Sequence, residues 1–345
     1  MTAQLEISTD GALGLIALNR PEAINALSLA MIEGVSAALE GWRSDTAIGA
    51  VLFSGNGAKG FCSGGDVRAA RALVLEGKAA DADAYFAAEY RMNGLIAGYP
   101  KPLVAITHGI VMGGGIGIAG HCGFRVTQPG ARFAMPESAI GFFADVGVNA
   151  ILAKAPLNRA LLFALSGVSV GASDALALGL ADAVVAIDQI DALRGDLKLA
   201  AAAPDPSNAI GRLLEAESII AGEAPFSALA DRLPANAESP AEFVDQVAAA
   251  PALDEIATLL RTRCPGSLVA TFFAQHEARR LMDVNKTLEM DLRLAAVMAR
   301  RPDFAEGVRA VLVDKDQSPR WSPPTLEAFD VERDAGPILA ARRGV

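Results

Sequence analysis

The sequence predicts an α/β protein with a largely parallel sheet, followed by a helical C-terminal region. Three observations lead to this prediction. Up to about residue 188, short apolar runs with strand character alternate with stretches that have helical periodicity. Beyond that point the chain is alanine-rich, broken by prolines and without a convincing strand pattern. Apolar residues make up 52% of the 345 residues and charged residues 20%, which is enough apolar material for a sizeable core.

The N-terminal segment predicts two strands, a helix and a third strand. LEIS and LGLIALN flank the dipeptide Asp10-Gly11, which is a hairpin signal. Helical periodicity runs from Asn25 to Trp42. The run AIGAVLFSG is then typical of a buried strand that ends in glycine.

The middle of the chain predicts further strands and helices around glycine-rich loops. The loop GNGAKGFCSGGD precedes a long helical stretch that ends near Gly98. PLVAITHGIVMGGGIGIAGHC predicts a strand, a glycine turn and a buried helix, and FRVTQPGARFAMPE predicts a strand pair around Pro129-Gly130. The uncharged run from Pro102 to Phe124 is long enough to span a bilayer. Its seven glycines and two histidines favour the strand and helix instead, so no membrane span is expected.

The loss of strand patterns and the gain in alanine after about residue 188 divide the chain into two predicted parts. Residues 1–190 form the α/β core, and residues 191–345 form the helical C-terminal region.

Charge and cysteine usage limit the classes of partner and the compartment. Thirty Lys and Arg residues against forty Asp and Glu residues give a net charge of −10. This argues against nucleic acid as a partner and gives no reason to expect membrane binding. Acidic residues precede the first basic residue, Arg20, so neither a signal peptide nor an Arg-rich transit peptide is expected. Cys62, Cys122 and Cys264 are too widely spaced for a disulfide framework or a zinc knuckle, and a cytoplasmic location is expected.

Two glycine clusters are candidates for binding an oxyanion. Gly64-Gly65 follows a predicted strand, and Gly113 to Gly115 lie between a predicted strand and helix. Glycine allows the backbone to approach a ligand closely, and a helix N-terminus offers unpaired N–H groups. Two such N–H groups that converge on one oxygen make an oxyanion hole. Two ordinary glycine turns are the alternative interpretation.

Three acidic residues are candidates for chemistry. Glu137 and Asp145 lie in the apolar segment RFAMPESAIGFFADVG, and Glu89 lies on a predicted helix beside aromatic residues. An acid among apolar residues is a candidate for a raised pKa and for general-base catalysis. The structural alternatives are a helix cap for Glu137, a turn aspartate for Asp145 and a solvated helix face for Glu89.

Several motifs resemble those of a known family. FCSGGD and HGIVMGGGIGIAG, followed by FAMPE, resemble the crotonase (enoyl-CoA hydratase/isomerase) superfamily over about residues 5–190. MPESAIGFFADVG, CPGSLVATFFAQ and DFAEGVRAVLVDKDQSPRWSP most resemble its 3-hydroxyisobutyryl-CoA hydrolase subgroup. The resemblance implies a crotonase-type spiral of ββα turns that binds an acyl-CoA in a bent shape. It implies no cofactor, because coenzyme A is part of the substrate, and it leaves a homo-oligomer open.

The resemblance also implies roles for the candidate residues. Gly65 and Gly114 would donate backbone N–H groups to the thioester carbonyl oxygen. Glu137 would be the main catalytic carboxylate, acting either as a base on water or as a nucleophile that forms a mixed anhydride. Asp145 would contact the acyl hydroxyl and help to position Glu137 or the water. Glu89 would line the acyl pocket.

One position separates two activities within this resemblance. Hydratases of the family usually carry a second glutamate three residues after the middle glycine of GGG, and Gly117 occupies that position here. The expected function is therefore thioester hydrolysis, converting 3-hydroxyisobutyryl-CoA to 3-hydroxyisobutyrate and CoA in valine catabolism. An enoyl-CoA hydratase or isomerase of the same fold is the alternative, and a non-catalytic acyl-CoA-binding protein is the third hypothesis. Two departures from the subgroup are Ser138 for threonine and Ala144 for proline.

Overall fold

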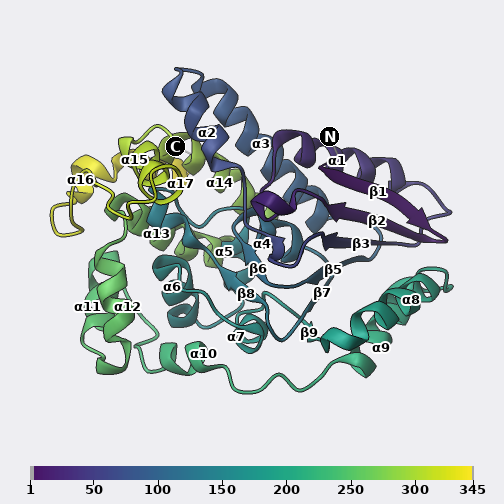
Figure 1. Ribbon diagram of the computed structural model, residues 1–345. Coiled ribbons are helices and arrows are strands. Elements are labelled where there is room, and N and C mark those ends of the chain that lie inside the picture. Colours follow the sequence, from purple (N-terminus) through teal and green to yellow (C-terminus); the bar gives the residue numbers. More distant parts are fainter. Residues whose placement is uncertain (1–3, 344–345) are drawn as a thin grey trace. The chain divides into compact units, whose positions relative to one another are not determined.

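A computed structural model describes residues 4–343 of the chain (Figure 1). The described residues divide into two compact units that are interleaved along the sequence. Unit 1 comprises Met1–Gly65, Arg91–Phe133 and Val170–Ala224, and unit 2 comprises Asp66–Tyr90, Ala134–Ser169 and Pro225–Val345. These units differ from the two sequential parts expected from the sequence, so the boundary near residue 190 stays a prediction.

Unit 1 is built on a six-stranded sheet with the order β1-β2-β3-β5-β7-β9. β1 and β2 pair antiparallel, and each following neighbour pairs parallel, as predicted. The strands are β1 (Leu5–Asp10), β2 (Leu13–Leu18), β3 (Ala50–Gly55), β5 (Leu103–Thr107), β7 (Phe124–Thr127) and β9 (Ala183–Val184).

A second, three-stranded sheet contains two strands, its first and second in the order below, that the sequence patterns do not reveal. Its order is β4 (Gly60–Cys62), β6 (Ile110–Met112) and β8 (Arg132–Ala134), and β4 pairs parallel with β6. The predicted strands on either side of Pro129-Gly130 are present as β7 and β8. They lie in different sheets, however, so they do not form a hairpin.

The uncharged run from Pro102 to Phe124 is divided among short elements. It forms β5, β6 and the buried helix α4 (Gly114–Ala119). The expected strand, glycine turn and buried helix are therefore confirmed, with β6 as an additional strand. Among the described residues, no helix is both long enough and apolar enough to cross a membrane.

Helix α1 (Leu29–Arg43) begins four residues later than the sequence pattern predicts. Asn25 has a positive φ of 55°, which is incompatible with the interior of a right-handed helix. Ser28 is the N-cap, and its side chain accepts a hydrogen bond from the Met31 N–H. The helical periodicity from Asn25 therefore includes an irregular segment that packs into the core before the helix starts.

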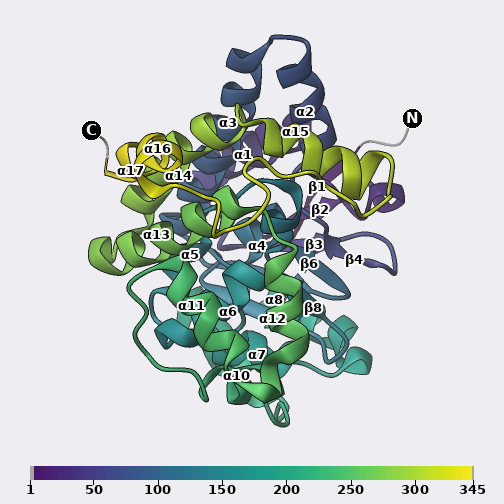
Figure 2. The ribbon, with the colours of Figure 1, turned by 90° about the vertical axis from the view of Figure 1, so that its left-hand side faces the viewer.

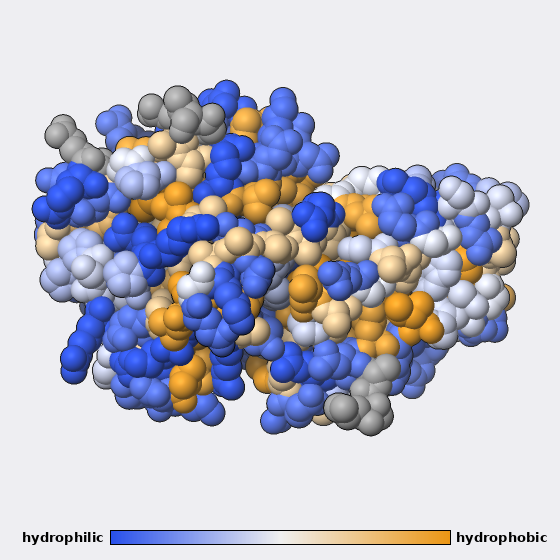
Figure 3. Space-filling view, turned by 90° about the horizontal axis from the view of Figure 1, so that it is seen from above, coloured by the Kyte–Doolittle hydropathy of each residue, from blue (hydrophilic) through white to orange (hydrophobic). Residues whose placement is uncertain are grey.

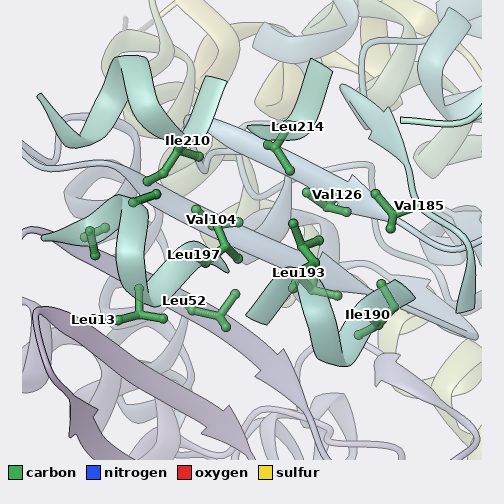
Figure 4. Packing of buried hydrophobic residues seen from close by; sticks show 14 residues of the cluster. Leu13, Leu52, Val104, Val126, Val185, Ile190, Leu193, Leu197, Ile210 and Leu214 are labelled. Carbon is green, nitrogen blue, oxygen red and sulfur yellow. The ribbon is translucent and has the colours of Figure 1, made fainter. Parts of the chain in front are cut away.

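A hydrophobic cluster of unit 1 lies between the sheet and two helices, α8 (Ile190–Ala201) and α9 (Pro206–Glu217). Figure 4 shows Leu52, Val104 and Val126 on the strands facing Leu193 and Leu197 on α8. The helices of this unit also include two 3₁₀ turns, Pro21–Ala23 and Ile187–Gln189, besides α7 (Ala172–Ala177), α8 (Ile190–Ala201) and α9 (Pro206–Glu217). Burial of this apolar surface favours the closed sheet–helix arrangement.

Unit 2 is largely helical, and Figure 2 shows α14 next to α17 within it. Helix α3 crosses from unit 2 into unit 1 after Tyr90. The helices are α2 (Val67–Leu75), α3 (Ala79–Ala97), α5 (Val148–Leu152), α6 (Leu157–Ser166), α10 (Pro225–Ala230), α11 (Pro240–Ala248), α12 (Asp254–Arg261), α13 (Pro265–Leu281), α14 (Val284–Met298), α15 (Pro302–Val308), α16 (Val331–Asp334) and α17 (Gly336–Arg343), with 3₁₀ turns at Pro136–Ile140 and Pro251–Leu253 and a π-helical turn at Arg309–Val313.

The exposed surface is mixed in character. In the view of Figure 3, hydrophobic areas are interrupted by hydrophilic residues. The most exposed large apolar side chain is Ile220, in the segment after α9, and Leu199 on α8 is also exposed. Exposed apolar side chains of this kind are ordinary on a soluble protein surface.

Helix α15 packs directly on the 3₁₀ turn Pro136–Ile140, and two glycines make the contact close. A Cβ added to Gly307 would lie 2.4–2.6 Å from backbone atoms of Ile140. A Cβ on Gly141, which has a φ of +73°, would lie 2.1 Å from the Asp303 carbonyl oxygen. The backbones therefore approach closely because neither residue carries a side chain.

Gly307→Ala is expected to lower the free energy of unfolding by about 1–3 kcal/mol, since the methyl group forces backbone shifts in a packed interior. Denaturant unfolding monitored by circular dichroism measures the change. Gly195→Ala is the matched control, because a Cβ at this exposed position of α8 would meet no atom within 4 Å. That control is expected to stabilise the helix by about 0.5–1 kcal/mol. Equal stability of Gly307→Ala and the parent protein would contradict the close packing.

Candidate active site

The loop that carries Gly65 follows β4 and is held by the segment before α1. The Ser63 N–H donates to the Ile24 carbonyl at 2.8 Å, and the Leu27 N–H donates to the Gly64 carbonyl at 2.8 Å. The second hydrogen bond holds the peptide group that joins Gly64 to Gly65, so it restrains the orientation of the Gly65 N–H.

Asn25 stabilises the same region from inside. The residue is fully buried, and its side-chain amide donates to the carbonyls of Asn56 and Phe61 at 3.0 and 2.9 Å. Its side-chain oxygen accepts from the Arg20 N–H at 2.8 Å. Asn tolerates the positive φ found here better than most residues. The helical periodicity predicted from Asn25 onward gives no sign of this structural role.

The loop that carries Gly114 lies beside the Gly64-Gly65 loop in unit 1. A Cβ on Gly64, whose φ is +113°, would lie 3.6 Å from the Gly114 nitrogen. Gly114 is the first residue of α4, so its N–H has no acceptor within the helix. The structure therefore brings the two glycine loops together, while the donor role of Gly65 and Gly114 stays a prediction.

Three predicted acids are buried in unit 2. The exposed fractions are 3% for Glu89, 8% for Glu137 and 5% for Asp145. The Tyr90 hydroxyl donates to Asp145 Oδ2 at 2.6 Å, which links α3 to the segment before α5. The alternative of a solvated helix face for Glu89 is wrong, because this side chain is buried.

Local backbone geometry fixes the positions of Glu137 and Asp145. Glu137 is in the 3₁₀ turn after β8, and its carbonyl accepts from the Phe142 N–H at 3.0 Å. Asp145 precedes two residues with positive φ, Val146 at 53° and Gly147 at 73°. The Asp145 side chain thus projects from a tight turn rather than from a regular helix.

Burial and mutual repulsion raise the pKa values of the acids. Burial raises the pKa of Glu137 well above its usual range, and the neighbouring Asp145 and Glu89 raise it further. Burial also raises the pKa of Asp145, although the hydrogen bond from Tyr90 opposes this shift. The pKa of Glu89 is raised to about 8 by burial and by Asp145. Because like charges in one buried group disfavour each other, ionisation of one of these carboxyls opposes ionisation of its neighbours.

Two carboxyl oxygens in this group have no hydrogen-bond partner among the described residues. They are Glu137 Oε2 and Glu89 Oε1, both inaccessible to solvent. Buried polar atoms are normally paired, so these two oxygens are free to bind a ligand or a water molecule. Phe142 stacks on Phe86 with ring centroids 5.0 Å apart, which supplies an apolar wall in the same unit.

The acidic group raises the question of a metal ion. Within residues 4–343, no group of three or more His, Cys, Asp or Glu side chains is arranged to hold one.

Sequence reasoning missed two residues of this group. The first is Tyr90, one of the aromatic residues beside Glu89, whose hydroxyl contacts Asp145 directly. The second is Asp291 on α14, which is fully buried. Burial is the main cause of the raised pKa of Asp291, and the neighbouring Asp145 raises this pKa further. A signal for Asp291 was available, because Leu288 and Leu294 at helical spacing place it on an apolar face.

Comparisons with known proteins match nearly the whole chain. A family model described as enoyl-CoA hydratase/isomerase matches residues 13–335. The chain is 38% identical to "3-hydroxyisobutyryl-CoA hydrolase, mitochondrial" of Danio rerio, over 92% of this chain and 84% of that protein. The human protein of the same name is 36% identical, over 93% of this chain and 85% of its own length.

Two solved structures have the same fold over almost their full length. A carnitinyl-CoA dehydratase from Mycobacterium thermoresistibile has a TM-score of 0.88 and 33% identity, covering 97% of this chain and 96% of that one. An enoyl-CoA hydratase from Rhodobacter sphaeroides 2.4.1 has a TM-score of 0.88 and 32% identity, covering 97% of each chain.

Proposed function

The chain belongs to the enoyl-CoA hydratase/isomerase family, and we propose that it cleaves 3-hydroxyisobutyryl-CoA to 3-hydroxyisobutyrate and coenzyme A. The predicted family resemblance and fold class are both confirmed. The curated relatives that cover more than nine-tenths of the chain support a thioester hydrolase.

The composition of α4 is the observation that carries the choice of hydrolysis. Residues 114–119 read GGIGIA, so Gly117 and its neighbours supply no carboxylate on this helix. Hydration of an enoyl-CoA by the family's two-carboxylate arrangement requires an acid at that position. Hydrolysis needs one main carboxylate, and Glu137 is the candidate.

The proposed mechanism uses the roles that the sequence resemblance implies. Backbone N–H groups of Gly65 and Gly114 stabilise the negative charge on the thioester oxygen. Glu137 either takes a proton from the attacking water or attacks the carbonyl carbon itself, giving an anhydride that water then hydrolyses. Both routes have the same net reaction. The carbon–sulfur bond of the thioester breaks, water supplies the oxygen and hydrogen atoms that are added, and the products are 3-hydroxyisobutyrate and the free thiol of coenzyme A.

Asp145 and Glu89 complete the proposed substrate site. Asp145 accepts a hydrogen bond from the acyl hydroxyl, and Glu89 lines the space for the acyl group. The buried position of both carboxyls supports these roles, because a desolvated polar group discriminates strongly against a substrate that leaves it unpaired.

An acyl-CoA panel tests the function directly. The panel contains 3-hydroxyisobutyryl-CoA, isobutyryl-CoA and crotonyl-CoA. Release of free thiol measures hydrolysis, and loss of the ultraviolet absorbance of the enoyl group measures hydration. We expect fast thiol release from 3-hydroxyisobutyryl-CoA. Loss of enoyl absorbance without thiol release would overturn the proposal.

Hydration or isomerisation of an enoyl-CoA is the second candidate function. The two full-length structural matches favour it, since one is named a carnitinyl-CoA dehydratase and the other an enoyl-CoA hydratase. Gly117 argues against it for the reason given above, and the same panel separates the two activities.

The remaining proposals concern binding and location. Coenzyme A enters as part of the substrate, and the proposed chemistry needs no other cofactor, nucleic acid or membrane. A homo-oligomer is proposed from the family resemblance, and light scattering measures the mass. The relatives' names place those proteins in mitochondria. For this chain, the expected cytoplasmic location stays a proposal, to be tested by cell fractionation.

Asp145→Asn is expected to reduce the preference for hydroxylated acyl groups by at least about tenfold, because an acceptor matched to the substrate hydroxyl is altered. The measurement is the ratio of kcat/KM for 3-hydroxyisobutyryl-CoA to that for isobutyryl-CoA. Binding of free coenzyme A serves as the control and should be unchanged. A ratio equal to that of the parent protein would remove Asp145 from acyl recognition.

The pH dependence of kcat/KM should report the raised pKa of Glu137. Only the ionised form acts as base or nucleophile, so the rate should rise with pH to a midpoint well above 4.5. In Asp145→Asn the midpoint should move to lower pH, since the nearby charge that raises the pKa of Glu137 is absent. A midpoint near 4.5 in the parent protein would contradict this assignment.

A further inference from the structure

Asp291 is a buried acid that the proposed mechanism does not use. It lies on α14, its side chain is fully buried, and its Oδ2 accepts a hydrogen bond from the Gly147 N–H at 2.8 Å. Gly147 is two residues beyond Asp145, so this contact joins α14 to the turn that carries the proposed acyl-recognition carboxyl.

The Asp145 turn has a backbone conformation that requires support. Val146 and Gly147 have φ angles of 53° and 73°, in the left-handed region. A β-branched residue such as Val146 adopts this conformation rarely, and the conformation persists only where surrounding contacts impose it.

Three buried side chains from three helices supply these contacts. On the C-terminal side of Asp145, Asp291 on α14 accepts a hydrogen bond from the Gly147 N–H. Before Asp145, the Ala144 N–H donates to Thr271 Oγ1 on α13 at 3.1 Å, and Asn149 Nδ2 on α5 donates to the Ala144 carbonyl at 2.6 Å. The turn is thus held on both sides of Asp145, and Asp291 holds the side with the left-handed residues.

The hydrogen bond from the Gly147 N–H is the contact by which Asp291 acts on the turn. Burial raises the pKa of Asp291 well above its usual range, and the Asp145 carboxylate raises it further, against the opposing effects of the Gly147 N–H and Arg293. Its Oδ1 is buried and has no partner among the described residues. The contact with Gly147 therefore needs only an acceptor oxygen at this position, which a carboxyl and a carboxamide both provide.

We infer that Asp291 is a positioning residue, which holds the Asp145–Gly147 turn through the Gly147 N–H and thereby sets the discrimination between hydroxylated and plain acyl groups. This inference rests on the proposed function. It assigns a role in substrate choice to Asp291 on α14, which lies more than 140 residues along the chain from the turn that it holds.

The test compares Asp291→Asn, Asp291→Leu and Asp291→Ala. Asn keeps an oxygen that accepts from Gly147, whereas Leu and Ala remove it. The measurement is the kcat/KM ratio for 3-hydroxyisobutyryl-CoA over isobutyryl-CoA. We expect the ratio to stay within about threefold of the parent in Asp291→Asn and to fall at least about tenfold in the other two. Glu289→Leu, at an exposed acid of the same helix, is the control and should leave the ratio unchanged.

Thermal unfolding of each variant identifies which of them fold. If Asp291→Leu does not fold, Asp291→Ala, which adds no bulk, provides the measurement. If folded Asp291→Leu or Asp291→Ala has the same kcat/KM ratio as the parent protein, the inference is overturned. An equally large fall of the ratio in Asp291→Asn also overturns it, because the effect would then depend on the acid itself and not on the acceptor oxygen.

Failure of the proposed function gives a different result. If the parent protein releases no thiol or shows no preference for the hydroxylated substrate, the proposed function fails before any Asp291 variant is considered. If the parent shows the preference and Asp145→Asn loses it while Asp291→Leu and Asp291→Ala keep it, the function stands and only the inference falls. If Asp145→Asn keeps the parental preference for the hydroxylated substrate, Asp145 does not recognise the acyl hydroxyl. The inference then falls, because Asp291 is inferred to act through Asp145.

Discussion

Replacement of Glu137 by Gln should lower kcat for thioester cleavage by at least about 100-fold while acyl-CoA binding is retained. Glutamine has nearly the same size and shape as glutamate, but it neither accepts a proton from water nor attacks a carbonyl carbon. Since Glu137 is 8% exposed and its Oε2 has no partner among the described residues, the substitution removes chemistry without breaking a visible contact of that oxygen. Stopped-flow thiol release and isothermal titration with a non-hydrolysable acyl-CoA analogue measure the two quantities.

Glu255→Gln is the matched control for this experiment. Glu255 is an exposed acid on α12 in the same unit, so its variant should cleave the substrate at the parent rate. A Glu137→Gln protein that is folded and retains more than about a tenth of parental kcat would assign the main catalytic role to another group.

Removal of one backbone donor should have an effect of similar size. Gly114→Pro lacks the N–H that is proposed to bind the thioester oxygen, and loss of one oxyanion donor lowers kcat by about 10²–10³-fold. Proline is well tolerated at this position because Gly114 is the first residue of α4, where the N–H has no helical acceptor and a φ near −65° suits the helix.

Gly114→Ala is the corresponding control, since it adds a side chain but keeps the N–H. We expect Gly114→Ala to retain most of its kcat relative to Gly114→Pro, with both variants folded by circular dichroism. Equal losses in the two variants would indicate that the side-chain volume, rather than the amide, determines the effect.

Local sequence patterns predicted much of the fold. Alternation and apolar runs located β1, β2, β3, β5 and β7 of the six-stranded sheet and predicted its largely parallel character, because each of these strands buries its own apolar side chains. The two-residue strand β9 was not predicted. The hairpin at Asp10-Gly11 followed from its turn residues. The predicted start of α1 at Asn25 was wrong. Asn25 has a positive φ, and its side chain forms hydrogen bonds to residues more than thirty positions away, which hold it outside the helix.

The candidate site divides in the same way. The sequence by itself determined the family, the glycine loops and the three acids Glu89, Glu137 and Asp145, because these residues lie in short motifs or among apolar neighbours. Only the tertiary structure decided that β7 and β8 enter different sheets, that Tyr90 binds Asp145 and that Asp291 holds the following turn. The physical reason is that hydrogen bonds and pKa values depend on burial and on distances between segments far apart in the chain, which no local periodicity encodes.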